Sequence, residues 1–201
     1  MPLTVRHLKF ALWSAGANWL AWKADFEFGG QPEQLPVLND EDRFKAFCGE
    51  YGVPRAATTD QRQVIRTWLR TPPNFTNAIG QGAVGIADLA DVHQEHLGGR
   101  QLSFFSKLAA FARPTQFMAY DNSARIGLAK VRNEPEAKYD HRYIEYSAAI
   151  DEVWHDNVGR EIRAFIGRAP PPVGGNRAAF GKRMLDVYLM LRGGRWPNVL
   201  L

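Results

Sequence analysis

The strongest constraint on the fold is a hydrophobic period of three to four residues that recurs along the chain. It appears first in a stripe near the N-terminus and then in two later ones: Leu8, Ala11, Leu12, Ala15 and Trp19; Tyr143, Tyr146, Ile150, Val153 and Trp154; Phe180, Met184, Val187, Tyr188 and Leu191. Such spacing places apolar side chains on one face of a helix. The alternating pattern of β-strand pairs is not found. The sequence therefore predicts a mostly α-helical, compact multi-helix domain with about seven to nine helices of average length.

Capping residues, glycines and prolines indicate where these helices begin and end. Asn39 is expected to cap a helix over DEDRFKAF, and Pro72 with Pro73 to end the helix before them. Three stretches rich in Gly, Pro and Asn are predicted to be loops: 24–38, 71–82 and 167–177. Three helices are predicted in the middle of the chain: 83–97, 102–112, and one that begins at Asp121 or Asn122.

The charge distribution indicates an anionic partner. The 201 residues suffice for one domain or two small ones, with a net charge of +4 and a pI of about 9.3. Against the single acid Asp121, residues 100–132 carry six basic residues: Arg100, Lys107, Arg113, Arg125, Lys130 and Arg132. Solvated helix faces would explain such residues too, but a basic stripe favours nucleic acid somewhat more.

Cysteine usage and hydropathy indicate a soluble cytoplasmic protein. A single cysteine, Cys48, excludes an internal disulfide and a Cys-rich metal site, and it is expected in the core. The N-terminal FALWSAGANWLAW faintly mimics a signal peptide, but Gly16 and Asn18 argue against one. No apolar run has the length of a membrane span. We expect a monomer with no membrane association and no obligate protein partner.

The stretch LADVHQEHLGGRQLSFFSKLAAF indicates two helices joined by a glycine turn at Gly98–Gly99. The first N–H groups of the second helix lack partners within the helix and can bind a phosphate, with Arg100 beside them. A plain helical hairpin explains the same residues without a ligand. His93 and His96, three residues apart, have a spacing that metal sites use, but a solvated helix face is the preferred interpretation.

Asp121 also has two interpretations. Aspartate is a good N-cap, and NSARIGLAKV behind it is compatible with a helix. A carboxylate anchored at a helix N-terminus is stabilised in its ionised form. It can then stabilise a developing positive charge, or orient and deprotonate a water molecule.

The order of helix, glycine hairpin, helix, proline-containing loop and Asp resembles the helix-hairpin-helix DNA glycosylase superfamily, in particular its 8-oxoguanine DNA glycosylase-like branch. The resemblance covers residues 97–125, through LGGRQLS, KLAAFARP and FMAYDNSAR. It implies a mostly α fold, a double-stranded DNA partner, and Asp121 as the catalytic carboxylate. The residues that it places at the DNA backbone are Gly98, Gly99 and Arg100, and Gln101, Ser103 and Arg125 are further candidates for DNA contacts. We expect a single helical domain over 1–201, with 83–132 as the hairpin and Asp segment, 139–201 as the C-terminal helices, and 1–82 as a candidate N-terminal subdomain.

One departure from the family pattern concerns the nucleophilic lysine of its bifunctional members. Its expected place falls near Gln101, and the lysine of this helix, Lys107, is too close to Asp121 in sequence. The chain is therefore predicted to be a monofunctional glycosylase, in which water displaces the base. Lys107 is a catalytic candidate only if the enzyme is bifunctional. A flipped-out base needs aromatic walls, for which the candidates are Phe104, Phe117, Tyr120 and Trp154. The resemblance implies no organic cofactor, and it allows a monovalent cation held by hairpin carbonyls.

The excised base and the activity itself stay open at this point. The branch indicates oxidised guanine, but the missing lysine weakens that inference. Alkylated bases, or bulky modified bases of phage DNA in a defence role, are alternatives. A non-catalytic helical DNA-binding module and a protein–protein adaptor are the two other functions compatible with the sequence.

Overall fold

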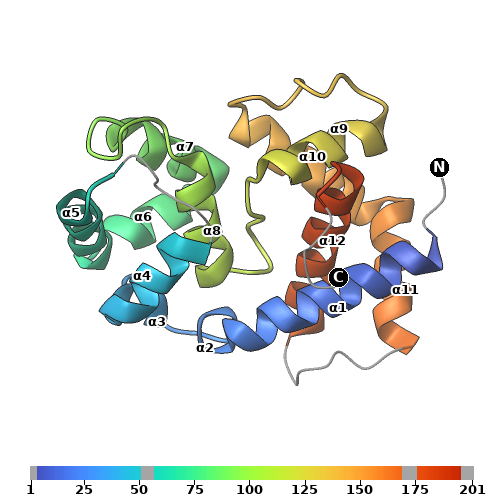
Figure 1. The fold of residues 1–201 in the computed structure, drawn as a ribbon, viewed down its shortest axis with the longest axis horizontal. Helices are drawn as coiled ribbons and strands as arrows, with labels where there is room; N and C mark the ends of the chain where they lie inside the picture. The colour runs from blue at the N-terminus through green and yellow to red at the C-terminus, as the bar shows by residue number, and fades with distance from the viewer. Residues whose placement is uncertain (1–3, 51–56, 169–175, 196–201) are drawn as a thin grey trace. The chain divides into compact units, whose positions relative to one another are not determined.

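A computed structural model describes residues 4–50, 57–168 and 176–195 (Figure 1). In these ranges the chain forms twelve α-helices, one 3-10 helix and no strand, which confirms the predicted mostly α-helical class. The elements are α1 (Val5–Ala21), α2 (Lys23–Phe26), η1 (Pro32–Gln34), α3 (Pro36–Asn39), α4 (Glu41–Glu50), α5 (Thr59–Arg70), α6 (Asn74–Gly80), α7 (Ala83–Val92), α8 (Leu102–Ala112), α9 (Asn122–Arg132), α10 (Tyr143–His155), α11 (Asn157–Arg168) and α12 (Arg177–Arg192).

There are more helices than predicted because the stretches 24–38 and 71–82 are not plain loops. All of η1 and most of α2 and α3 lie in the first, and α6 lies in the second. These elements are only three to seven residues long, too short to show a hydrophobic period. The predicted loop at 167–177 falls largely outside the described residues.

Several predicted boundaries also change. Asn39 is the last residue of α3, and Asp40 caps α4 by accepting a hydrogen bond from the Arg43 N–H at 2.9 Å. α7 ends at Val92, because residues 93–99 make hydrogen bonds of mixed span in place of the regular helical ladder. α8 and the start of α9 agree with prediction. In the described ranges, no helix combines the length and apolarity that crossing a membrane requires.

The chain divides into two compact units. The first comprises residues 1–23 and 120–201, and the second comprises residues 24–119. The expected segment 83–132 therefore contributes to both: Gly98 and Gly99 belong to the second unit, and Asp121 belongs to the first.

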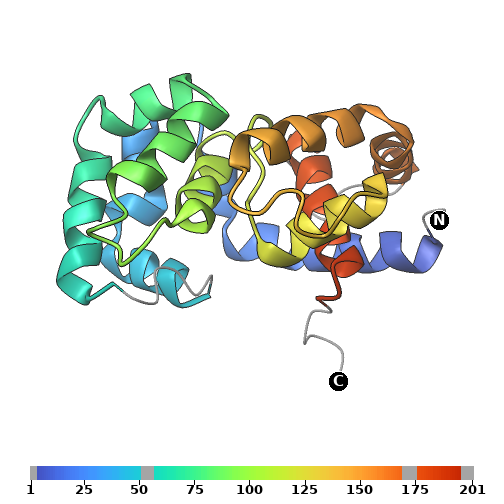
Figure 2. The ribbon, with the colours of Figure 1, turned by 90° about the horizontal axis from the view of Figure 1, so that it is seen from above.

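The first unit is built around α12, which packs against α1, α9 and α11. Figure 2 shows α9 and α1 beside α12. α12 buries residues on most of its circumference, and one of them, Phe180, makes an edge contact with Trp19 of α1 at 5.8 Å between ring centroids. A helix covered on several sides has a weakly one-sided pattern, and α12 is the interior of this unit.

Two glycines allow α9 and α12 to approach at backbone distance. A Cβ atom added to Gly127 of α9 would lie 1.8 Å from the carbonyl oxygen of Leu189. A Cβ atom on Gly193, at the end of α12, would lie 1.8 Å from the carbonyl oxygen of Ser123. These contacts fix the N-terminal end of α9 against the C-terminal end of α12.

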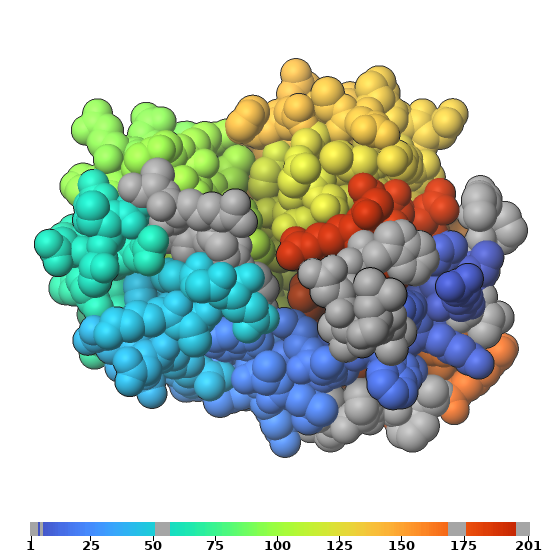
Figure 3. All heavy atoms as spheres, in the orientation of Figure 1, coloured from blue at the N-terminus to red at the C-terminus, as the bar shows by residue number. Residues whose placement is uncertain are grey.

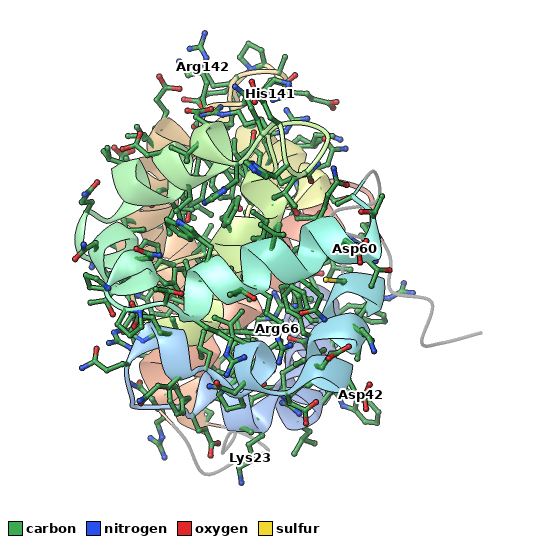
Figure 4. The ribbon with its side chains drawn as sticks, turned by 90° about the vertical axis from the view of Figure 1, so that its left-hand side faces the viewer. Lys23, Asp42, Asp60, Arg66, His141 and Arg142 are labelled. Carbon is green, nitrogen blue, oxygen red and sulfur yellow. The ribbon has the colours of Figure 1, made fainter. Side chains whose placement is uncertain are left out.

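The second unit has a core of phenylalanines. Phe47 of α4 makes edge contacts with Phe104 and Phe111 of α8, at 5.9 and 5.5 Å. Figure 4 shows Arg66 of α5 directed into this unit, where its guanidinium donates to the carbonyls of Leu38 at 2.7 Å and Asn39 at 3.0 Å. These bonds satisfy carbonyls at the end of α3 that have no partner within the helix.

Candidate active site at the start of α9

Asp121 is the N-cap of α9. Its Oδ1 accepts a hydrogen bond from the backbone N–H of Ser123 at 2.9 Å, and its backbone carbonyl accepts from the Arg125 N–H. The side chain is 14% exposed. The carboxylate is thus held by a cap hydrogen bond and is close to the surface, so both interpretations of Asp121 are compatible with this position.

The second oxygen of Asp121 faces Arg195. The guanidinium Nη1 lies 3.1 Å from Oδ2, and the Arg195 side chain is 55% exposed. Arg195 follows the end of α12, where Gly194 has a φ of 95° and the Arg195 N–H donates to the carbonyl of Met190 at 3.0 Å. On the face shown in Figure 3, atoms at the end of α12 (red) border atoms of the α9 region (yellow). No local sequence motif indicates this partner, and Arg195 is not among the predicted site residues.

A tyrosine cluster holds the residue before Asp121. The Tyr120 ring makes edge contacts with Tyr143 and Tyr146 of α10, at 5.9 and 5.1 Å, and its hydroxyl donates to the carbonyl of Tyr139 at 2.6 Å. Burial raises the pKa of the Tyr146 hydroxyl well above its ordinary value, and Tyr143 and the negative charge of Asp121 add to this. The backbone leading to Asp121 is therefore fixed by a largely buried, uncharged layer.

The candidate base-pocket rings other than Tyr120 are buried. Phe104 is packed among the phenylalanines of the second unit, Phe117 is 2% exposed, and Trp154 packs on Gly181 under the guanidinium of Arg163. Tyr120 is half-buried. In this conformation only Tyr120 of the four candidates combines proximity to Asp121 with partial exposure.

The connection between α7 and α8 carries the predicted glycine turn. Gly98 and Gly99 have φ values of 66° and 135°, and the Gly99 N–H donates to the carbonyl of Gln94 at 2.7 Å. Gln101 is the N-cap of α8 but makes no capping hydrogen bond through its side chain, and Ser103 lies half-buried in the first turn. The first N–H groups of α8 are therefore not capped by the Gln101 side chain. A phosphate site at a helix N-terminus requires such uncapped N–H groups.

Three carbonyls of this connection accept hydrogen bonds from within it: His93 from Leu97 N–H, Gln94 from Gly99 N–H, and Leu97 from the Gln101 amide. A cation held by carbonyls needs several oxygens that converge on one point. The monovalent cation that the resemblance allows at this connection stays a prediction. In the ranges that the structure covers, no three His, Cys, Asp or Glu side chains are grouped as metal ligands would be.

The basic residues of 100–132 are less available than their number indicates. Among the described residues, four of them form ion pairs: Arg100 with Asp91, Arg125 with Asp140, Lys130 with Glu136, and Arg132 with Glu134 and Glu152. Most of these acids follow residue 132 in the chain. Because exposed ion pairs contribute about 0–1 kcal/mol each, a phosphate can compete for the cations of the exposed pairs, Arg100 and Lys130.

Arg125 and Lys107 differ from the positions expected of ligand-binding residues. The side chain of Arg125 is 12% exposed and donates to the Glu136 carbonyl at 2.9 Å, so it fastens the segment before α10. Lys107 is buried in α8 and belongs to the second unit. Arg125 therefore has a structural role in this conformation, and Lys107 is a largely buried residue of the unit that does not contain Asp121.

His93 was expected on a solvated face, and that prediction is wrong. Its side chain is 6% exposed and packs against Trp68 at 4.5 Å and Phe105 at 5.9 Å between ring centroids. Neither ring nitrogen has a hydrogen-bond partner among the described residues. Burial, with a smaller contribution from His96, lowers the pKa of His93 below 6.5. The ring serves as an apolar contact between α5 and α8.

We expect the protein to lose stability in mild acid through His93. A group whose pKa is lowered in the folded state binds its proton more readily when unfolded. Its contribution to the free energy of unfolding is complete above pH 6.5 and is lost as the pH falls through the lowered value. Thermal unfolding from pH 7.5 to pH 5 should show a smaller fall in Tm for His93→Phe than for the unaltered chain. His155→Gln, at an exposed histidine of the first unit, is the control; equal pH dependence for all three proteins would contradict the prediction.

Comparisons with known proteins give no family for this chain. No protein-family model, no curated protein and no solved structure matches it. Its function is therefore argued from the residues and geometry above.

Proposed function

We propose that the chain is a monofunctional DNA glycosylase that hydrolyses the N-glycosidic bond of a modified base turned out of the duplex. The observation that carries this proposal is the placement of Asp121: a carboxylate fixed by a helix cap, near the surface, behind a buried tyrosine layer. The likeness of residues 97–125 to helix-hairpin-helix glycosylases supports it. In this proposal the protein is a monomer that acts on double-stranded DNA in the cytoplasm.

Asp121 would act on a bond that breaks with positive charge on the sugar. The carbon–nitrogen bond to the base lengthens, its electron pair leaves with the base, and the sugar gains oxocarbenium character. The ionised carboxylate stabilises that charge and orients a water molecule toward the anomeric carbon. The water oxygen bonds to this carbon, its proton passes to Asp121, and the departing base takes a proton from solvent. An abasic site and a free base result.

DNA binding is assigned to the α7–α8 connection. Gly98 and Gly99 allow a tight approach of the backbone to a strand, and the first N–H groups of α8 provide donors for a phosphate. Arg100 lies beside them, in an exposed pair with Asp91. A phosphate can draw Arg100 from Asp91, because an exposed pair is held weakly.

The test is abasic-site formation on a panel of labelled DNA. Purified protein is incubated with plain duplex, oxidised duplex, alkylated duplex and phage DNA with modified bases, and then with alkali or an abasic-site endonuclease. Strand breaks that appear only after this treatment would establish a monofunctional glycosylase and its substrate class. Breaks without treatment would indicate a lyase. An absence of breaks on every DNA would contradict the proposal.

A second function, a DNA-binding module without chemistry, is favoured by the same contacts of Asp121. The cap bond to Ser123 and the ion pair with Arg195 give this carboxylate a complete structural role. Such a module would bind duplex with steep salt dependence and release no base. Absence of duplex binding even at low salt would point to a protein–protein adaptor.

A further inference from the structure

The ion pair between Asp121 and Arg195 occupies the oxygen that the proposed chemistry needs. Oδ1 accepts the Ser123 N–H, and Oδ2 lies 3.1 Å from the Arg195 guanidinium. A carboxylate engaged on both oxygens is less able to orient a water molecule or to stabilise a sugar cation, because its oxygens are occupied and its charge is already offset. Catalysis therefore benefits if Arg195 leaves Oδ2 when substrate arrives.

Arg195 is suited to leave. Its side chain is 55% exposed, whereas that of Asp121 is 14% exposed, so the guanidinium is the partner that can move into solvent. The Met190 carbonyl holds the Arg195 N–H at 3.0 Å, so the backbone can stay in place while the side chain turns. Guanidinium binds phosphate through two parallel hydrogen bonds, whereas Arg195 contacts Asp121 through Nη1 and Oδ2 at 3.1 Å.

We propose that Arg195 leaves Asp121 and binds a DNA phosphate instead. In the free protein the ion pair offsets the negative charge of Asp121, and in the complex the carboxylate is released from this pair. This inference rests on the proposed function and adds a positioning residue to it. The phosphate concerned belongs to the strand beside the turned-out nucleotide, since the sugar of that nucleotide must approach Asp121. Substrate binding and activation of the carboxylate then become one event.

The test is a double-mutant cycle on DNA affinity, which needs no catalysis. The proteins are the unaltered chain, Asp121→Asn, Arg195→Gln and the double variant. The probe is a short duplex with a tetrahydrofuran abasic-site analogue, which has no N-glycosidic bond to cleave. Affinities are measured over a range of salt concentrations. Arg142→Gln is the matched control: Arg142 is 58% exposed, pairs with Glu145 at 3.7 Å, and points outward at the rim in Figure 4.

Asp121→Asn should tighten binding several-fold when Arg195 is present and less when it is absent. In the first background it frees the arginine and removes a negative charge; in the second it only removes the charge. Arg195→Gln should weaken binding and lower the slope of log affinity against log salt by about 0.9, the share of one phosphate. Arg195→Lys should restore most of that slope, and Arg142→Gln should show no coupling to Asp121.

Equal tightening by Asp121→Asn in both backgrounds would overturn the exchange, because a fixed Arg195 gives additive effects. The outcome is separable from that of the glycosylase proposal. Base release on the DNA panel with an additive cycle would retain the enzyme and remove the exchange. A coupled cycle without base release would retain the exchange in a binding module. Absence of binding to the analogue duplex at low salt would overturn the exchange outright.

Discussion

Asp121→Asn is expected to reduce base release by about 10²–10³-fold, the usual effect of removing one charged or polar group that stabilises a transition state. Asn retains a side-chain oxygen that can accept the Ser123 N–H, and it caps helices as well as Asp does. The fold should therefore survive, with a Tm within a few degrees of the unaltered protein. The rate is measured as alkali-dependent strand breaks under single-turnover conditions.

A matched carboxylate in the same unit provides the control. Asp151 of α10 pairs with Lys182 at 2.8 Å and is 51% exposed, so Asp151→Asn removes one ion-paired charge away from the start of α9. It should leave base release within a few-fold of the unaltered protein. Equal rates for Asp121→Asn and the unaltered protein would exclude Asp121 from the chemistry. Asp121→Ala is less informative, because loss of the cap costs about 1 kcal/mol.

Gly127→Ala is expected to destabilise the protein by about 3 kcal/mol or more, at the upper end of the cost of overpacking. The added Cβ atom would lie 1.8 Å from the Leu189 carbonyl oxygen, which belongs to the backbone of α12 and cannot rotate away. α9 would have to move from α12 and carry Asp121 with it. A fall in Tm of roughly ten degrees is expected from thermal unfolding.

The direction of the stability change is the informative result for Gly127→Ala. Alanine in place of a helical glycine normally stabilises by about 0.5–1 kcal/mol. Gly167 of α11 provides that reference, since a Cβ atom there would have no neighbour within 4 Å. Gly167→Ala should be neutral or stabilising. A Gly127→Ala protein as stable as Gly167→Ala would mean that α9 and α12 do not approach as described.

The helices and the cap could be predicted because their signals are local. Asp121 and NSARIGLAKV are adjacent in sequence, and the stripes on α1, α10 and α12 repeat every three or four residues. Arg195 could not be predicted, because 74 positions separate it from Asp121 and only the packing of α9 on α12 brings them together. The availability of the basic residues of 100–132 to an anionic partner was overestimated for a related reason. Composition does not show which acidic residue pairs with each of them.

The prediction that His93 lies on a solvated helix face is wrong because it was based on the polarity of histidine and not on the spacing of its apolar neighbours. His93 was assigned to solvent as a polar residue, but its ring fills a space between Trp68 and Phe105 that is closed to water. The sequence contains a weak signal for this, since His93 lies four residues before Leu97, which is also buried. A helix-like spacing from a buried leucine favours burial of the histidine as well, and a neutral imidazole can be buried in this way.

The division of the first unit along the chain has a consequence for synthesis on the ribosome. α1 emerges first, yet its partner α12 begins at Arg177, with 155 residues between Ala21 and Arg177. At about 5–20 residues per second this interval lasts roughly 8–30 seconds. During it the second unit, which is continuous in sequence, can fold completely, while Ala11, Ala15 and Trp19 of α1 lack the helix that later buries them. The nascent chain can therefore complete the second unit before the first, and α1 reaches its final place only after α12 has emerged.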